Sequence, residues 1–167
     1  MIYTSYFYAV RFMPHTMLPV STALFDPKWF HMNRGQHYIY RDRRGVLNGV
    51  RSLPLVPGAD CKDLCDGKDC LRLPSTCGFL KTYQRQLEKF GTGAFDEHLV
   101  RLQCAAQKAA EIDGFDPNES IDICFLFHEK PDQPCSERVP FHNWLRQNEY
   151  LFQEFDWQAA KNAQTAV

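Results

Sequence analysis

The stretch IDICFLF, residues 121–127, is a nearly continuous apolar run. A strand has this pattern when both of its faces are buried, as in a parallel sheet that helices cover. Upstream, residues 79–90 and 95–112 place apolar side chains at helical spacing, and Gly91 and Gly93 separate the two runs. The sequence therefore predicts two consecutive helices that lead into a central, buried strand.

Further strands and a last helix extend this pattern. Residues 1–10 are rich in Tyr, Phe, Ile and Val and predict a strand, and residues 18–24 predict a second one. The aromatic residues 37–40 indicate another extended segment, and residues 137–147 predict a helix that follows the buried strand. Because strands alternate with helices, the sequence predicts an α/β fold with a mostly parallel sheet.

Length and composition indicate one domain. The 167 residues include 13 Phe, 7 Tyr and 3 Trp, which suffice for an apolar core. We expect a single domain over residues 1–157, with 41–77 as a cysteine-rich insertion and 158–167 as a disordered tail. No stretch approaches the roughly 18–20 apolar residues of a membrane span. The N-terminus lacks the features of a signal peptide, so a cytoplasmic location is expected.

The charge balance limits the nucleic-acid interpretation. A formal net charge of −1 argues against a large nonspecific nucleic-acid surface, which needs a basic excess. The best local candidate for a small basic patch is RDRRGVLNGVR, residues 41–51. A solvated loop is the alternative interpretation of that segment.

A cysteine cluster, CKDLCDGKDCLRLPSTC, occupies residues 61–77. Its members Cys61, Cys65, Cys70 and Cys77 could surround one zinc ion as a tetrahedral site, which would order a long aperiodic segment. The spacing lacks the paired Cys-x-x-Cys units of common zinc sites. An iron–sulfur cluster could use the same thiolates, and four reduced thiols are the third possibility. A closed four-cysteine zinc site would be structural, because no coordination position remains for water.

A second group of reactive residues lies in HEKPDQPCSER, residues 128–138, between the buried strand and the last helix. In parallel α/β sheets, ligands bind at this carboxyl edge. Exposed amides at the start of the helix favour an anion and would activate Cys135 as a nucleophile. Arg138 could grip a phosphate or carboxylate, and Glu129 could move a proton. The alternative is that Cys135 is merely semi-buried and Arg138 pairs with a nearby carboxylate.

The end of the first predicted strand reaches the same edge. Ser5 and Tyr6 would bring hydroxyl groups to a pocket there. They complete the set of expected ligand-binding groups that the residues themselves indicate.

Both ends of the chain resemble a known family. The segments MIYTSYF (1–7), LPVSTALFDPKWF (18–30) and FHEKPDQPCSERVPFHNWL (127–145) are similar to the "domain of unknown function 488" family of bacterial and phage proteins. The resemblance implies a three-layer α/β arrangement, and it implies little about activity. Glu129, Lys130 and Cys135 fall on the family's pattern, which adds Lys130 to the expected ligand-binding residues.

The chain also departs from that pattern. It has Cys-Ser-Glu-Arg where the family has Cys-His-Arg, and Ser21-Thr22-Ala23 where many members have Asp-Val-Arg. The middle of the chain, with its four cysteines, resembles the family poorly and looks like an insertion.

Three functions remain open at this point. The first is binding or processing of a small anionic, nucleotide-like ligand at the carboxyl edge of the sheet, by an enzyme or a binding domain. The second is a non-enzymatic interaction protein that binds a protein or nucleic acid through the insertion and the segment 41–44. The third is a thiol-based redox or metal sensor.

Overall fold

The computed structural model describes residues 1–30, 39, 48–62, 64 and 74–165. Its centre is a five-stranded sheet with the order β3-β2-β4-β1-β5, in which every pair of neighbouring strands is parallel. The predicted α/β class with a parallel sheet is therefore confirmed. The strands are β1 (Ile2–Tyr6), β2 (Met17–Ser21), β3 (Val50–Arg51), β4 (Asp122–Phe127) and β5 (Phe152–Glu154).

The apolar run 121–127 forms the central strand β4, between β1 and β2. Residues 123–127 are all buried, because side chains of a strand alternate between two faces and helical elements cover both. Ile123, Phe125 and Phe127 belong to one apolar cluster, whereas Cys124 and Leu126 belong to the other. The sequence prediction for this segment is confirmed.

The first face of the sheet packs against α2 (Gly78–Ile112) and α3 (Arg138–Gln147), with the short α1 (Ala59–Lys62) beside α2. Phe95 of α2 lies at the centre of this layer. Its ring centroid is 5.9 Å from that of Phe125 in β4 and 5.1 Å from that of Trp144 in α3. Two 3₁₀ turns, η2 (Leu53–Leu55) and η3 (Pro74–Thr76), complete the described part of this layer.

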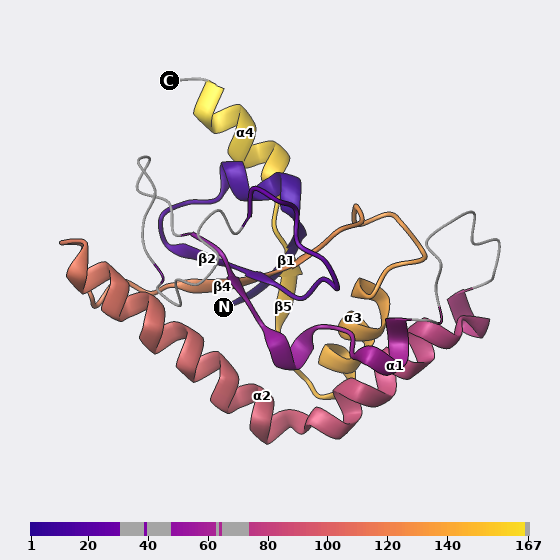
Figure 1. Cartoon of the computed structure of the whole chain (residues 1–167). Helices are drawn as coiled ribbons and strands as arrows, with labels where there is room; N and C mark the ends of the chain where they lie inside the picture. The colour runs from indigo at the N-terminus through magenta and orange to yellow at the C-terminus, as the bar shows by residue number, and fades with distance from the viewer. Residues whose placement is uncertain (31–38, 40–47, 63, 65–73, 166–167) are drawn as a thin grey trace.

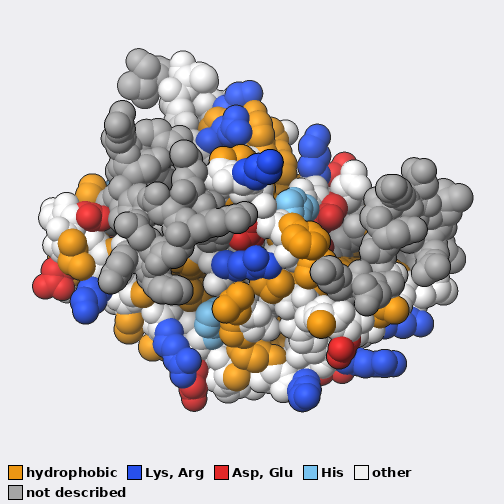
Figure 2. All heavy atoms as spheres, in the orientation of Figure 1, with side chains coloured by type: hydrophobic (Ala, Val, Ile, Leu, Met, Phe, Trp, Pro, Cys, Tyr) orange, Lys and Arg blue, Asp and Glu red, His pale blue; other side chains and the backbone are white. Residues whose placement is uncertain are grey.

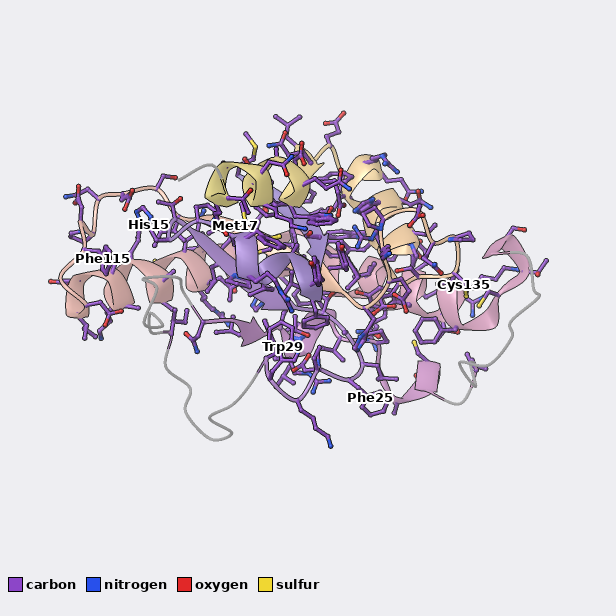
Figure 3. The ribbon with its side chains drawn as sticks, turned by 90° about the horizontal axis from the view of Figure 1, so that it is seen from above. His15, Met17, Phe25, Trp29, Phe115 and Cys135 are labelled. Carbon is purple, nitrogen blue, oxygen red and sulfur yellow. The ribbon has the colours of Figure 1, made fainter. Side chains whose placement is uncertain are left out.

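The two helices predicted from residues 79–112 are present and share the label α2, because they meet at a kink at Gly91. Gly91 has φ 75° and ψ 164°, which is not helical, and the helix continues on either side of it. α2 spans the molecule, so that Cys135 and Phe115 lie near its opposite ends (Figure 3). Among the described residues, no helix is long and apolar enough to cross a membrane.

The second face carries η1 (Phe7–Phe12) and α4 (Trp157–Thr165), which lie together at the top of Figure 1. Residues 158–165 belong to the helix α4, which corrects the prediction of a disordered tail for this part of 158–167, and residues 166–167 lie outside the described residues. The Asp156 side chain accepts a hydrogen bond from the Ala159 backbone N–H at 2.9 Å, which caps the first turn. Trp157 anchors this turn on the aromatic rings of β1 and η1. Composition alone does not reveal such an anchor.

Candidate functional site

The chain leaves β1 and β4 on opposite sides of the sheet. β1 continues into η1 on the second face, whereas the segment after β4 leads to α3 on the first face. The two strands are neighbours, with Tyr6 paired to Phe127 at their carboxyl ends. In open parallel sheets such a point leaves a crevice outside the strand ends, and ligands bind there.

A groove of about 880 Å³ lies beside these strand ends. It is formed by the end of β1, by η1, by the first residues after β4 and by the first turn of α4. Its walls combine three aromatic rings with charged and polar side chains, namely Tyr6, Tyr8, His128, Lys130, Pro131, Asp132, Trp157 and Gln158.

The aromatic wall is built around Trp157. The ring packs edge-to-face against Tyr6 and Tyr8, with centroids 5.9 and 5.3 Å apart, and it stacks on Phe12 at 5.9 Å. The Arg11 guanidinium lies 4.4 Å from the centre of the Tyr8 ring. Basic and hydrophobic side chains accordingly lie next to each other over η1 and α4 in Figure 2.

The polar wall comes from the segment between β4 and α3, residues 128–137, which we call the β4–α3 loop. Lys130 and Asp132 are exposed, and they bring one charge of each sign to the groove. His128 Nε2 contacts the backbone oxygen of Phe25. Burial, then the neighbouring Tyr8 and Asp132, raises the pKa of Tyr6, so its hydroxyl keeps its proton at neutral pH and can donate a hydrogen bond.

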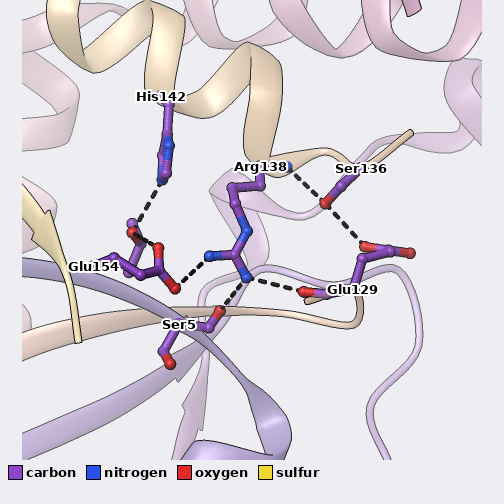
Figure 4. Close-up of polar contacts among 7 residues, drawn as sticks. Ser5, Glu129, Ser136, Arg138, His142 and Glu154 are labelled. Carbon is purple, nitrogen blue, oxygen red and sulfur yellow. Dashed lines mark hydrogen bonds and ion pairs between the residues drawn. The ribbon is translucent and has the colours of Figure 1, made fainter. Parts of the chain in front are cut away.

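Arg138 does not face the groove, because its guanidinium is buried among protein groups (Figure 4). Nη1 pairs with Glu154 Oε1 at 2.5 Å, and Nη2 donates to the backbone oxygens of Ser5 and Glu129, both at 2.9 Å. The guanidinium carbon also lies 4.9 Å from the centre of the Phe127 ring. Arg138 therefore joins β1, β5 and the β4–α3 loop, and in this conformation it offers no grip for an external anion.

A chain of hydrogen bonds extends this cluster to α3. Thr4 Oγ1 donates to Glu154 Oε2 at 2.7 Å and lies 3.0 Å from His142 Nε2. Burial, with the positive charges of Arg138 and Arg146, lowers the pKa of His142 to about 4, so the ring is neutral at pH 7. Since the Thr4 proton goes to Glu154, His142 carries its proton on Nε2 and donates to Thr4.

Two residues of the β4–α3 loop, Glu129 and Glu137, have carboxyl groups that do not line the groove. Ser136 Oγ donates to Glu129 Oε2 at 2.9 Å and accepts the backbone N–H of Arg138 at 3.2 Å. Glu137 is only 6% exposed. Burial, then the charge of Glu129, raises the pKa of Glu137 to about 7. The sequence analysis gave no role to Glu137, because a glutamate at the start of a helix ordinarily faces water.

The structure separates the residues that the sequence analysis had grouped. Tyr6 and Lys130 line the groove, whereas Ser5 is buried and its Oγ has no hydrogen-bond partner among the described residues. Glu129 does not line the groove, and its carboxylate accepts a hydrogen bond from Ser136. Cys135 is half-buried on the loop, is not a groove-lining residue, and lies apart from Phe25 and Trp29 (Figure 3).

Half of the cysteine cluster lies within the described residues. Cys61 and Cys77 are both buried, whereas Cys65 and Cys70 lie outside the described residues, as do Arg41, Arg43 and Arg44. In the described ranges there is no group of three or more metal-ligating side chains. The zinc site, the iron–sulfur alternative and the basic patch therefore stay predictions.

Comparisons with known proteins add no family. No family model, curated protein or solved structure matches this chain. The resemblance to the "domain of unknown function 488" family therefore stays a prediction from the residues at the two ends of the chain.

Proposed function

We propose that this protein binds a small anionic ligand that carries an aromatic ring, of the nucleotide type, in the groove at the carboxyl ends of β1 and β4. The position of the groove is the observation that carries the proposal: the chain leaves these two neighbouring strands on opposite faces. This is the place where open parallel sheets bind their ligands. A volume of about 880 Å³ is in the range of small-molecule sites, about 300–1,000 Å³.

The composition of the walls supports a ligand with two chemical parts. Tyr8 and Trp157 offer aromatic surface, on which a flat ring can stack. Lys130 is exposed at the same groove and supplies a charge for a phosphate or carboxylate. Asp132 adds an acceptor for an amino group of the ring.

Catalysis remains a separate prediction. Glu129 and Cys135 were expected to move a proton and to act as the nucleophile, yet neither lines the groove. Binding therefore forms the proposal, and Cys135→Ala in any later assay of turnover decides the role of the thiol.

Isothermal titration calorimetry tests the proposal with three probes: a nucleoside monophosphate, the matching nucleoside and ribose 5-phosphate. Lys130→Gln should weaken the nucleotide about tenfold and leave the nucleoside unchanged, because only the charged contact is lost. Tyr8→Leu should weaken both the nucleotide and the nucleoside, since stacking on one ring contributes about 1–3 kcal/mol.

Lys161→Gln is the matched control for Lys130→Gln. Lys161 is an exposed lysine of α4 that does not line the groove, so its replacement should leave all three affinities unchanged. Absence of nucleotide binding by the unmodified protein would contradict the proposal, and so would equal affinities in Lys130→Gln and the unmodified protein.

A further inference from the structure

The β4–α3 loop meets α3 at a cluster with an excess of negative charge. Arg138 is the buried cation of this cluster: it pairs with the Glu154 carboxylate and acts on the Glu137 carboxyl group, whereas it contacts Glu129 through the backbone oxygen. The Glu129 carboxylate accepts a hydrogen bond from Ser136 and acts on Glu137. Its Nη1 is already committed to Glu154 at 2.5 Å, and its Nη2 donates to two backbone oxygens. Arg138 therefore cannot neutralise three ionised carboxylates.

Among the residues that the structure describes, Arg138 is the only cation that acts on Glu137. The charged and titratable groups near it are Glu129 from the loop, Arg138 from α3 and Tyr83 from α2. The Tyr83 ring is fully buried, and its hydroxyl donates to the Leu55 backbone oxygen at 2.6 Å, so it stays neutral. Lys130 is exposed at the groove, where water solvates it. A buried carboxylate without a cation is costly, so protonation is the favoured way to accommodate it.

The neighbouring carboxyl group completes the site for a proton. Glu129 is hydrogen-bonded through Ser136 to the first backbone N–H of α3, which fixes it beside Glu137. Burial and Glu129 raise the pKa of Glu137 to about 7, as expected where one arginine faces more than one carboxylate. Two adjacent carboxyl groups that share one proton are the known solution for such a pair.

We propose that Glu129 and Glu137 take up one proton when the β4–α3 loop packs against α3, so that protons hold this loop closed. The closed state binds the proton more tightly than a loop exposed to water does. Closure is therefore strongest in mild acid and weakens as pH rises from the ordinary pKa of a glutamate, about 4.5, toward about 7. Above that range both states are ionised and the dependence ends.

Protonation of Glu129 and Glu137 would also affect the groove. His128, Lys130 and Asp132 belong to the same loop and line the groove, so a loosened loop changes one of its walls. The inference itself does not require a ligand, and it stands or falls independently of the proposed function.

Hydrogen–deuterium exchange of peptides that cover residues 128–137 tests the proposal in the protein alone. After correction for the intrinsic pH dependence of exchange, the opening equilibrium of the loop should rise at least tenfold between pH 5 and pH 8. Glu137→Gln replaces the acid with a neutral amide of the same shape, so its opening equilibrium should not change with pH. Glu111→Gln, at an exposed position of α2, should behave as the unmodified protein does.

Glu129→Gln provides a second route if Glu137→Gln does not fold. It removes the other charge of the pair and should reduce the pH dependence, which burial of Glu137 then maintains alone. His142 stays neutral over this range, since its pKa is about 4. His128 is retained in every variant. A loop whose opening is the same at pH 5 and pH 8 in the unmodified protein would overturn the proposal, as would an unchanged pH dependence in both variants.

Discussion

At the scale of single residues, Arg138 was predicted to hold an anion, and in the structure it is bound to protein groups instead. Its position at the start of α3 was predicted from the strand-to-helix transition. Its partners were not predictable, because Glu154 and Ser5 lie 16 and 133 residues away in sequence. The sequence analysis considered that Arg138 pairs with a nearby carboxylate. In the structure, Arg138 instead forms an ion pair with Glu154 and donates a hydrogen bond to the backbone oxygen of Glu129.

If Arg138 positions protein groups, its loss should lower stability. Arg138→Met should reduce the free energy of unfolding by about 3 kcal/mol. The substitution removes the ion pair with Glu154 and the hydrogen bonds to two backbone oxygens. We expect the low end of the range for broken buried pairs, since about a third of the Glu154 side chain is exposed. Chemical denaturation measures the change.

A double-mutant cycle separates the ion pair from the packing of the side chain. Arg138→Met combined with Glu154→Gln should cost at least about 1 kcal/mol less than the sum of the single changes, because neither charge is then left alone. Additive effects would show that the pair contributes nothing. An Arg138→Met protein of normal stability that no longer binds nucleotide would show that Arg138 holds the ligand.

At the scale of secondary-structure elements, α2 illustrates what glycine patterns predict. Gly91 and Gly93 indicated an interruption, and the structure has one at Gly91, where two helical segments meet at a kink. Of these two glycines, only Gly91 has a backbone conformation, φ 75° and ψ 164°, that other residues avoid. The kink thus depends on one glycine, and the sequence does not distinguish it from its neighbour two positions later.

Gly91→Ala should therefore lower the free energy of unfolding by about 1–3 kcal/mol through backbone strain alone. A Cβ at this position meets nothing within 4 Å, so steric overlap does not contribute. Gly93→Ala is the matched control, because this position is helical, exposed and equally open, and alanine there should raise stability by about 0.5–1 kcal/mol. Equal effects of the two substitutions in thermal denaturation would contradict the role given to Gly91.

At the scale of the whole molecule, the parallel sheet followed from the buried run 121–127 and from the alternation of strands and helices. β3 and β5 contain two and three residues, and segments this short have no readable periodicity, so their pairing depends on the rest of the sheet. The sequence also predicted a ligand site at the carboxyl edge, where the structure has a groove, and ligand binding there stays a prediction. The contribution of Trp157 was not predicted, because residues next to a polar terminal segment carry no sign of a tertiary contact.

The central claim is that a nucleotide-like anion binds at the carboxyl ends of β1 and β4. Its most direct test is a two-dimensional NMR titration of the isotope-labelled protein with a nucleoside monophosphate. The account predicts saturable shifts of the backbone amides of Tyr6, Tyr8, Lys130 and Trp157 and of the Trp157 indole N–H. The buried Trp144 indole should stay unchanged. Shifts confined to the cysteine-rich residues 61–77, or a spectrum that the nucleotide leaves unchanged, would contradict it.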